Sequence, residues 1–178
     1  MQKDIKKALE VLRQGGIILY PTDTIWGIGC DATNEKAVKR IYDLKKRTDS
    51  KSMLNLVDHI GRISAYVQEV PSIAYDLVEL STQPLTIIYP EAKNLANNLL
   101  AEDKSIGIRV TEETFSKTLC ERFKKPIVST SANISNTKAP ENFNEISDEI
   151  KENVDYIVQY RQKEKKKNTA SSIIKISQ

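Results

Sequence analysis

Three groups of polar and charged residues stand where predicted strands and helices end, and their side chains suit the binding of phosphate groups. They are Thr22, Asp23 and Thr24; Lys45, Arg47 and Lys51; and the stretch STSAN at 129–133. Arginine offers a bidentate fork to phosphate oxygens, lysine offers a point charge, and hydroxyl and amide groups orient the oxygens. Because the chain has no G-x-x-x-x-G-K-[ST] loop, the groups predict a phosphate cradle of another construction.

Each group also has an ordinary structural interpretation. The first is typical of a turn held by side-chain hydrogen bonds, the second of cations at a helix C-terminus, and the third of a cap on the next segment. Trp26 is expected either to pack at the core edge or to form a wall of a substrate pocket, and Gly27 and Gly29 allow close approach of the backbone to a small ligand. Convergence of the three groups favours ligand binding, because ligands bind at strand ends in open α/β sheets.

The elements that position these groups follow from hydrophobic periodicity. Apolar residues at helical spacing predict helices over 4–14, 35–47, 72–80, 114–123 and 144–150, and Thr33 or Asn34 can cap the second. Short apolar runs predict strands over 17–20, 53–57, 85–89, 106–110, 126–130, 155–160 and 171–176. The alternation predicts an α/β fold in which helices pack on a sheet with some antiparallel pairing.

Length and composition narrow the class of protein. A chain of 178 residues suits one domain over 1–178. Cys30 and Cys120 have no histidine cluster nearby, so we expect reduced, packed thiols and no metal site, and we expect the single His59 to cap a turn. A net charge of +3 suits anionic small molecules or RNA. Since we find no apolar run of membrane length and no signal sequence, we expect a cytoplasmic protein with no membrane partner.

The segment RQKEKKKN at 161–168 carries five positive charges and one negative charge. Such a block is typical of a solvated loop between two strands. The alternative is a mobile basic flap that closes over an anionic ligand. Both interpretations stand at this point.

Six stretches resemble, in order, the motifs of the YrdC-like L-threonylcarbamoyladenylate synthase family: YPTDTIWGIGCDA, KKRTDSK, PLTIIYP, IGIRV, STSAN and SSIIKI. The resemblance covers about residues 17–176. It implies a twisted open mixed sheet with flanking helices and a basic concave face, in the short, single-domain form of the family.

The same resemblance implies an enzyme, a nucleotidyltransferase that joins L-threonine, bicarbonate or CO2, and ATP into threonylcarbamoyl-AMP and pyrophosphate. Mg²⁺ would arrive with ATP, and no protein-held metal is implied. The product would serve the threonylcarbamoyladenosine modification of tRNA through a downstream threonylcarbamoyl transferase complex. A further partner would be tRNA or double-stranded RNA that the protein binds directly.

Matching positions carry the expected roles. Lys45, Arg47 and Lys51 would be the catalytic cations on the ATP phosphates and the carbonate-derived group. Threonine would be bound by Thr22, Thr24 and Arg109. The nucleotide would be bound by Lys45, Arg47, Ser131, Asn133 and Ser171. The chain departs from the family pattern in two places. Asn136 replaces a glycine, and the exchange is tolerable because asparagine also adopts left-handed backbone dihedrals. The last motif differs at Ser172 and Lys175.

Two other functions are compatible with the fold. One is a non-catalytic module that binds double-stranded or structured RNA through the basic face and 161–168. Its weakness is that aromatic residues make up 6% of the chain and are not interleaved with the basic residues as stacking platforms. The other is an accessory domain of a carbamoyltransferase, which would sit in a longer chain with zinc-finger-like cysteines.

Overall fold

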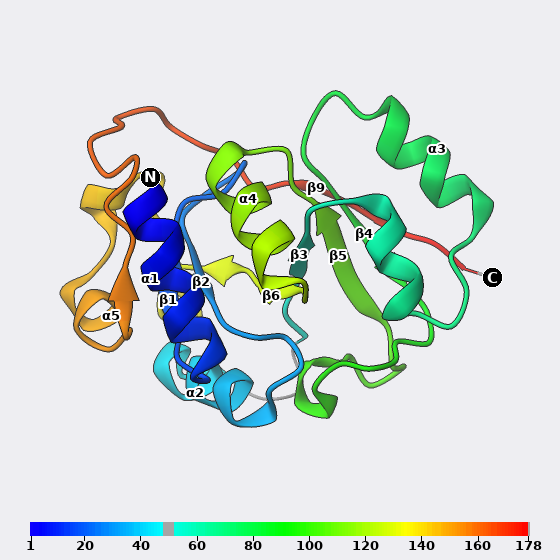
Figure 1. Ribbon diagram of the computed structural model, residues 1–178, viewed down its shortest axis with the longest axis horizontal. Coiled ribbons are helices and arrows are strands. Elements are labelled where there is room, and N and C mark those ends of the chain that lie inside the picture. Colours follow the sequence, from blue (N-terminus) through cyan, green and yellow to red (C-terminus); the bar gives the residue numbers. More distant parts are fainter. Residues whose placement is uncertain (48–51, 178) are drawn as a thin grey trace.

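The computed structural model describes residues 1–47 and 52–177 and consists of two mixed β-sheets with helices packed against them (Figure 1). The helices described are α1 (Gln2–Arg13), α2 (Glu35–Lys45), α3 (Ser72–Leu80), α4 (Thr114–Phe123) and α5 (Asp148–Glu152), with short 3-10 turns η1 (Ile60–Ala65), η2 (Asn97–Leu99) and η3 (Phe143–Glu145). The strands are β1 (Ile18–Tyr20), β2 (Gly27–Gly29), β3 (Asn55–Val57), β4 (Leu85–Tyr89), β5 (Ile106–Val110), β6 (Ile127–Val128), β7 (Thr130–Ser131), β8 (Tyr156–Ile157) and β9 (Ser172–Lys175). The predicted mixed α/β class is confirmed.

The strands divide into a four-stranded sheet, β7-β2-β1-β8, and a five-stranded sheet, β6-β3-β5-β4-β9. In the first, β1 runs antiparallel to β2 and parallel to β8. In the second, β4 runs antiparallel to β5 and parallel to β9, and β3 runs parallel to β5. Both sheets are therefore mixed, as the short connections predicted.

The segment predicted as one strand over 126–130 instead passes from one sheet into the other. Its first half, β6, pairs with β3 of the five-stranded sheet, and its second half, β7, pairs with β2 of the four-stranded sheet. Ser129 lies at the change, where its N–H still donates to the Leu54 carbonyl. This crossing joins the two sheets and brings residues 129–131 to the boundary between them.

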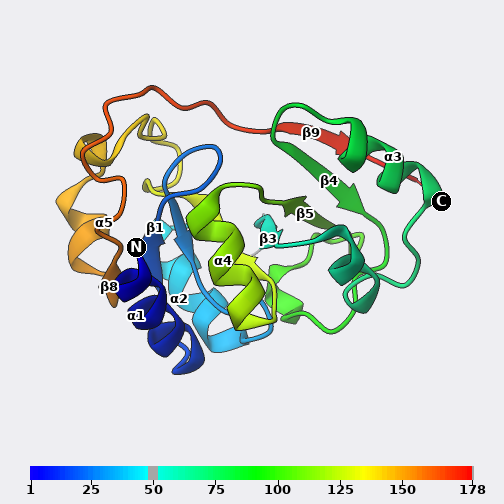
Figure 2. The ribbon, with the colours of Figure 1, turned by 45° about the horizontal axis from the view of Figure 1, so that its top comes forward.

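One hydrophobic core underlies both sheets. Ile18, Leu19 and Ile28 of the four-stranded sheet and Leu56, Ile87 and Ile108 of the five-stranded sheet are all buried in the same cluster. Helices α1 and α4 pack against each other and lie side by side in Figures 1 and 2. Each turns an apolar stripe inward, as amphipathic helices do.

Several sequence predictions are confirmed to the residue. The bounds of α3, β4, β5 and α4 coincide with those predicted. Helix α2 ends two residues early, because Lys46 adopts a left-handed conformation with φ 52° and terminates the helix. Asn34, rather than Thr33, caps α2 by accepting from the Ala37 N–H. Strand β2 lies in a stretch for which the hydrophobic pattern predicts no strand.

Other expectations about single residues are also confirmed. Cys30 and Cys120 are free and buried, and His59 caps η1 by accepting from the Gly61 N–H at 3.0 Å. Asn136 has φ 67°, the left-handed value expected where the family pattern has glycine. Within the described residues, none of the helices has the length and apolar character needed to span a bilayer.

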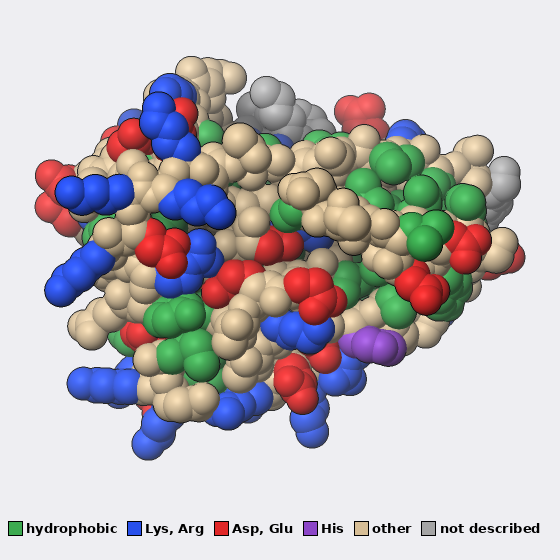
Figure 3. Space-filling view, turned by 90° about the horizontal axis from the view of Figure 1, so that it is seen from above, with side chains coloured by type: hydrophobic (Ala, Val, Ile, Leu, Met, Phe, Trp, Pro, Cys, Tyr) green, Lys and Arg blue, Asp and Glu red, His purple; other side chains and the backbone are tan. Residues whose placement is uncertain are grey.

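On the face shown in Figure 3, charged and hydrophobic side chains gather at opposite ends. Lysine and arginine side chains project mainly at the end where α5 and β8 lie, interspersed with acidic ones. Hydrophobic side chains gather at the opposite end, over α3, where Ile73, Tyr75 and Leu80 are exposed.

Candidate functional site

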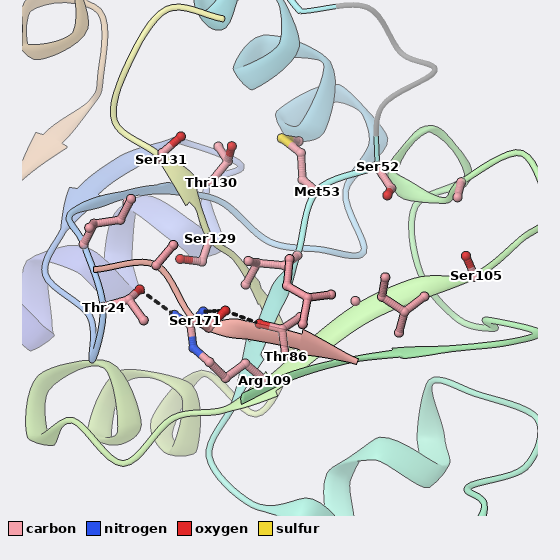
Figure 4. Close-up of a pocket in the computed structure, with 18 of the residues that line it drawn as sticks. Thr24, Ser52, Met53, Thr86, Ser105, Arg109, Ser129, Thr130, Ser131 and Ser171 are labelled. Atoms are coloured by element: carbon pink, nitrogen blue, oxygen red, sulfur yellow. Dashed lines mark hydrogen bonds between the residues drawn. The ribbon is translucent and has the colours of Figure 1, made fainter. Parts of the chain in front are cut away.

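A cavity of about 800 Å³ opens where residues of the two sheets meet (Figure 4). The four-stranded sheet and its loops contribute residues 24–27 and 129–131. The five-stranded sheet and its loops contribute Met53, Leu54, Thr86, Ile88, Gly107, Arg109, Ser171, Ile173 and Lys175. Arg47, Ser52, 101–103, Ser105, Ala139 and Ala170 complete the wall. Hydroxyl groups, two arginines, a lysine and two acidic residues thus line the cavity together with apolar side chains, a combination that suits a polar small molecule.

Arg109 is the centre of a hydrogen-bond network at one end of this cavity. Its side chain is 2% exposed, and it lies on β5. Nε donates to Asp23 Oδ1 at 3.1 Å, Nη2 donates to Thr24 Oγ1 at 3.2 Å, and Nη1 donates to Ser171 Oγ at 3.3 Å. Ser171 in turn lies 2.7 Å from Thr86 Oγ1. Figure 4 shows Thr24, Thr86 and Ser171 gathered around this guanidinium.

Asp23 pairs with Arg109. Its Oδ1 lies 3.0 Å from Arg109 Nη2, so one carboxylate oxygen meets two guanidinium nitrogens. Burial raises the pKa of Asp23, and the charge of Arg109 opposes that rise. The carboxylate therefore orients the guanidinium and compensates its buried charge.

Thr22 and Thr24, both predicted to bind threonine, are buried and belong to the same turn. Thr22 Oγ1 donates to the Ile25 carbonyl at 2.8 Å and accepts from the Thr24 N–H at 3.1 Å. Thr24 lines the cavity, whereas Thr22 does not. The structure thus gives Thr22 the turn-forming role and leaves Thr24 at the cavity wall.

Lys45 ends α2 and is held by backbone carbonyls of the STSAN stretch. Its Nζ donates to the Ser131 carbonyl at 2.5 Å and to the Asn133 carbonyl at 2.7 Å. The residue is 1% exposed and does not line the cavity. Burial, together with the charge of Arg47, lowers the pKa of Lys45 to about 8. In this arrangement the ammonium fixes the path of residues 131–133.

Arg47 lines the cavity, and Lys51 lies outside the described residues. Arg47 Nη2 donates to the Ser52 carbonyl at 2.7 Å. Its buried Nε has no hydrogen-bond partner among the described residues. Burial lowers the pKa of Arg47, as expected for a cation placed where water is partly excluded.

Ser131 and Asn133 end the crossing segment. Ser131 lines the cavity and is labelled in Figure 4 beside Thr130. Asn133 instead uses its side-chain Nδ2 to donate to the Ile134 and Thr137 carbonyls, so it secures the following turn. Of the predicted nucleotide-binding residues, the structure therefore places Arg47, Ser131 and Ser171 at the cavity and Lys45 and Asn133 behind its wall.

Trp26 packs at the edge of the core and also lines the cavity. It is 4% exposed and packs against Phe143, with the two rings tilted and their centroids 4.9 Å apart. The two glycines after it serve strand packing. A Cβ on Gly29 would lie 2.5 Å from the Tyr20 ring and 2.6 Å from the Val128 carbonyl, and one on Gly27 would lie 2.9 Å from Ser129 Oγ. Gly29 thus permits close approach of protein to protein, whereas Gly27 also borders the cavity.

Sequence reasoning missed several residues of the site. Thr86 sits inside a predicted strand, and its hydroxyl was unremarkable until the fold placed it beside Ser171. Met53 and Ser105 line the cavity although no motif marked them, and Ile173 lines it from within the SSIIKI stretch, where it had been given no role. Such residues could be found as hydroxyl groups on the strand face that points into the cavity, but that face is known only once the strand register is known.

The chain matches the family model Sua5_yciO_yrdC, described as "Telomere recombination", over residues 10–178. It is 34% identical over 160 residues to the threonylcarbamoyl-AMP synthase of Pseudoalteromonas translucida (strain TAC 125), which covers 88% of this chain and 86% of that protein.

Solved structures show the same fold. E. coli YciO has a TM-score of 0.85 at 25% identity and covers 100% of this chain and 86% of its own. P. abyssi Sua5, crystallised with L-threonine, has a TM-score of 0.86 at 23% identity over 97% of this chain. The present chain spans about half, 50%, of the length of that Sua5 protein. The family model, the curated relative and the shared fold establish that this chain belongs to the Sua5/YciO/YrdC family.

Proposed function

We propose that the protein is an L-threonylcarbamoyladenylate synthase, which makes threonylcarbamoyl-AMP and pyrophosphate from L-threonine, bicarbonate or CO2, and ATP. The observation that carries the proposal is the Arg109 network in the 800 Å³ cavity, in a chain 34% identical to a threonylcarbamoyl-AMP synthase. A buried guanidinium beside small hydroxyls is suited to the carboxylate of an amino acid. P. abyssi Sua5, whose fold the chain shares, has been crystallised with L-threonine.

The Arg109 end of the cavity would hold threonine. Arg109 is kept in one orientation by Asp23, Thr24 and Ser171, so little side-chain entropy is lost when a carboxylate binds it. The hydroxyls of Thr24 and Ser171 are close enough to this point to meet the ammonium or hydroxyl group of threonine. Thr22 would contribute by shaping the turn that presents Thr24.

The Arg47 and Ser131 end would hold the ATP phosphates. Arg47 has a buried Nε without a partner in the described part of the chain, which a phosphate oxygen would satisfy. Lys45 would act there through the Ser131 and Asn133 carbonyls that it holds. Lys51 would supply a further cation to the phosphates.

The reaction then requires positioning and charge neutralisation more than covalent help. The threonine amine adds to CO2 to give a carbamate and releases a proton. A carbamate oxygen attacks the α-phosphorus of ATP, an O–P bond forms, and the bond to the bridging oxygen breaks to release pyrophosphate. The cations would neutralise charge on the phosphates, and Mg²⁺ would enter with ATP as part of that substrate. The reaction class is nucleotidyl transfer.

The wider setting of the reaction is part of the same proposal. The product would pass to a threonylcarbamoyl transferase complex that modifies tRNA, and the reaction would take place in the cytoplasm. A basic concave face, which the family resemblance implies, is the surface that we expect to meet RNA. None of these partners is needed for the synthase reaction itself.

The direct test is pyrophosphate release from ATP and Mg²⁺ by purified protein, with and without L-threonine and bicarbonate. We expect release that requires both co-substrates and that is reduced when serine replaces threonine. The adenylate product would be identified by mass spectrometry. Absence of release together with salt-sensitive RNA binding would overturn the proposal and favour a binding module.

A further inference from the structure

The connection from β8 to β9 crosses the top of the molecule in Figures 1 and 2, and its residues 161–171 form a strap that ends at β9. The strap begins at Arg161, whose backbone is left-handed with φ 67°. Such a conformation is unfavourable for a residue with a long side chain and persists where surrounding contacts impose it. Contacts of Arg161 with its neighbours must therefore hold this backbone conformation.

Arg161 joins three segments that are distant in sequence. Its Nη1 donates to the Thr22 carbonyl at 2.9 Å and lies 3.4 Å from Glu113 Oε1, and its Nε donates to Glu164 Oε2 at 2.9 Å. The side chain is 16% exposed and that of Glu113 is 11% exposed. This partial burial distinguishes the pair from the exposed ion pairs of the surface, which contribute little.

Glu113 is itself fixed at the start of α4. Its carboxylate accepts from the Phe115 N–H at 3.1 Å and from the Ser116 N–H at 2.7 Å. A carboxylate held in this way is a rigid partner for a guanidinium. Arg161 therefore ties the loop after β1 to a fixed point of the fold.

The far end of the strap reaches the same loop from the other side. Ser171 accepts from Arg109 Nη1, and Arg109 also bonds to Asp23 and Thr24. Two arginines therefore hold the loop 22–24: Arg161 donates to the backbone carbonyl of Thr22, and Arg109 donates to the side chains of Asp23 and Thr24.

We infer that Arg161 is a positioning residue that sets the threonine-binding loop 22–24 through the carbonyl of Thr22. The inference rests on the proposed function. It also assigns 161–168 a role that neither earlier interpretation contained, since its first residue is an anchor and only the residues after it are a solvated loop. Arg161 does not line the cavity that Arg47 and Arg109 line, so it acts on the substrate only through the loop.

The test compares Arg161→Gln with Lys163→Gln, which removes the same charge two residues further along from an exposed side chain. For R161Q we expect KM for threonine to rise at least about fivefold with kcat within about twofold, because the lost contact shapes binding and touches no reacting atom. K163Q should match the wild type. R161K, which keeps the charge without the fork, should fall between.

Limited trypsin digestion gives a readout that does not depend on activity. Lys163, Lys165, Lys166 and Lys167 offer cleavage sites in the strap, and each glutamine variant removes one site. We expect the strap of R161Q to be cut at least about fivefold faster than that of K163Q, because loss of an anchor raises the population of the open segment. Threonine with ATP should slow cleavage of the wild type and have less effect on R161Q, since coupling is reciprocal.

The outcomes separate the inference from the proposed function. Equal KM for threonine in R161Q and K163Q overturns the inference, as does an equal cleavage rate. A wild-type protein without threonine-dependent pyrophosphate release overturns the proposed function and, with it, the assignment to threonine. Faster cleavage of R161Q would in that case still support Arg161 as the anchor of the strap.

Discussion

At the scale of single residues, two buried cations are stabilised in different ways. Arg109 is compensated by the carboxylate of Asp23, whereas Lys45 donates to the carbonyl and side-chain oxygens of Ser131 and Asn133. Carbonyl dipoles stabilise an ammonium less fully than a counter-ion does, which agrees with the lowered pKa of Lys45. Residue type and spacing predicted Lys45 as part of a phosphate cradle, and the family resemblance added Arg109, but only the structure shows what each one touches.

The lowered pKa of Lys45 predicts a pH-dependent stability. Below pH about 8 Lys45 is protonated in the folded and unfolded states alike. Between about 8 and the unfolded value of about 10.4, the unfolded state binds more protons, so the free energy of unfolding gains a contribution that rises with pH. Chemical denaturation of wild type and Lys45→Met across this range should show the wild type gaining relative to the variant. A constant difference would contradict the prediction.

Arg47 carries the sharpest prediction for activity. Arg47→Ala removes a charge-assisted contact worth about 2 to 4 kcal/mol where water is excluded, so kcat/KM should fall at least about 30-fold. The matched control is Lys46→Ala, because Lys46 is the neighbouring cation and its exposed side chain pairs with Glu149. Pyrophosphate release measured for both variants tests whether Arg47 contributes to the reaction. Near-full turnover by R47A would remove Arg47 from the phosphate site.

At the scale of elements, the strength of the hydrophobic pattern determined what sequence could predict. Helices α3 and α4 and strands β4 and β5 combine regular apolar spacing with clear ends, and their bounds were predicted to the residue. Strand β2 reads Gly-Ile-Gly and has too few side chains to show alternation. The division of 126–131 between two sheets depends on long-range pairing, which local sequence does not contain.

The pairing of β2 predicts a strong steric requirement at Gly29. In Gly29→Ala, the added Cβ would meet the Tyr20 ring and the Val128 carbonyl at 2.5 and 2.6 Å. The strands must then separate, and we expect a loss of about 1 to 3 kcal/mol in the free energy of unfolding. Gly107→Ala is the control in another strand, since the nearest atom to its Cβ is a Thr86 methyl group at 3.3 Å. Equal losses from urea denaturation would contradict this account.

At the scale of the whole molecule, one core shared by two sheets predicts cooperative unfolding. Buried residues of both sheets belong to a single cluster, so neither sheet has a separate core to retain when the other melts. Trp26 is the only tryptophan in the chain and lies at the cavity wall. Its fluorescence and the far-UV circular dichroism should therefore give coincident denaturation curves. Two separated midpoints would show that the sheets unfold independently.

The crossing of residues 127–131 from one sheet to the other has a consequence for hydrogen exchange. Adjacent amides of the crossing are bonded on different sides: Val128 N–H donates to the Cys30 carbonyl, next to β2, and Ser129 N–H donates to the Leu54 carbonyl, next to β3. A ligand that contacts Arg109 on one sheet and Ser131 on the other would hold the two sheets in their relative orientation. Its binding would slow amide exchange along the crossing segment without adding a hydrogen bond to those amides, so exchange in this segment would report whether the cavity is occupied.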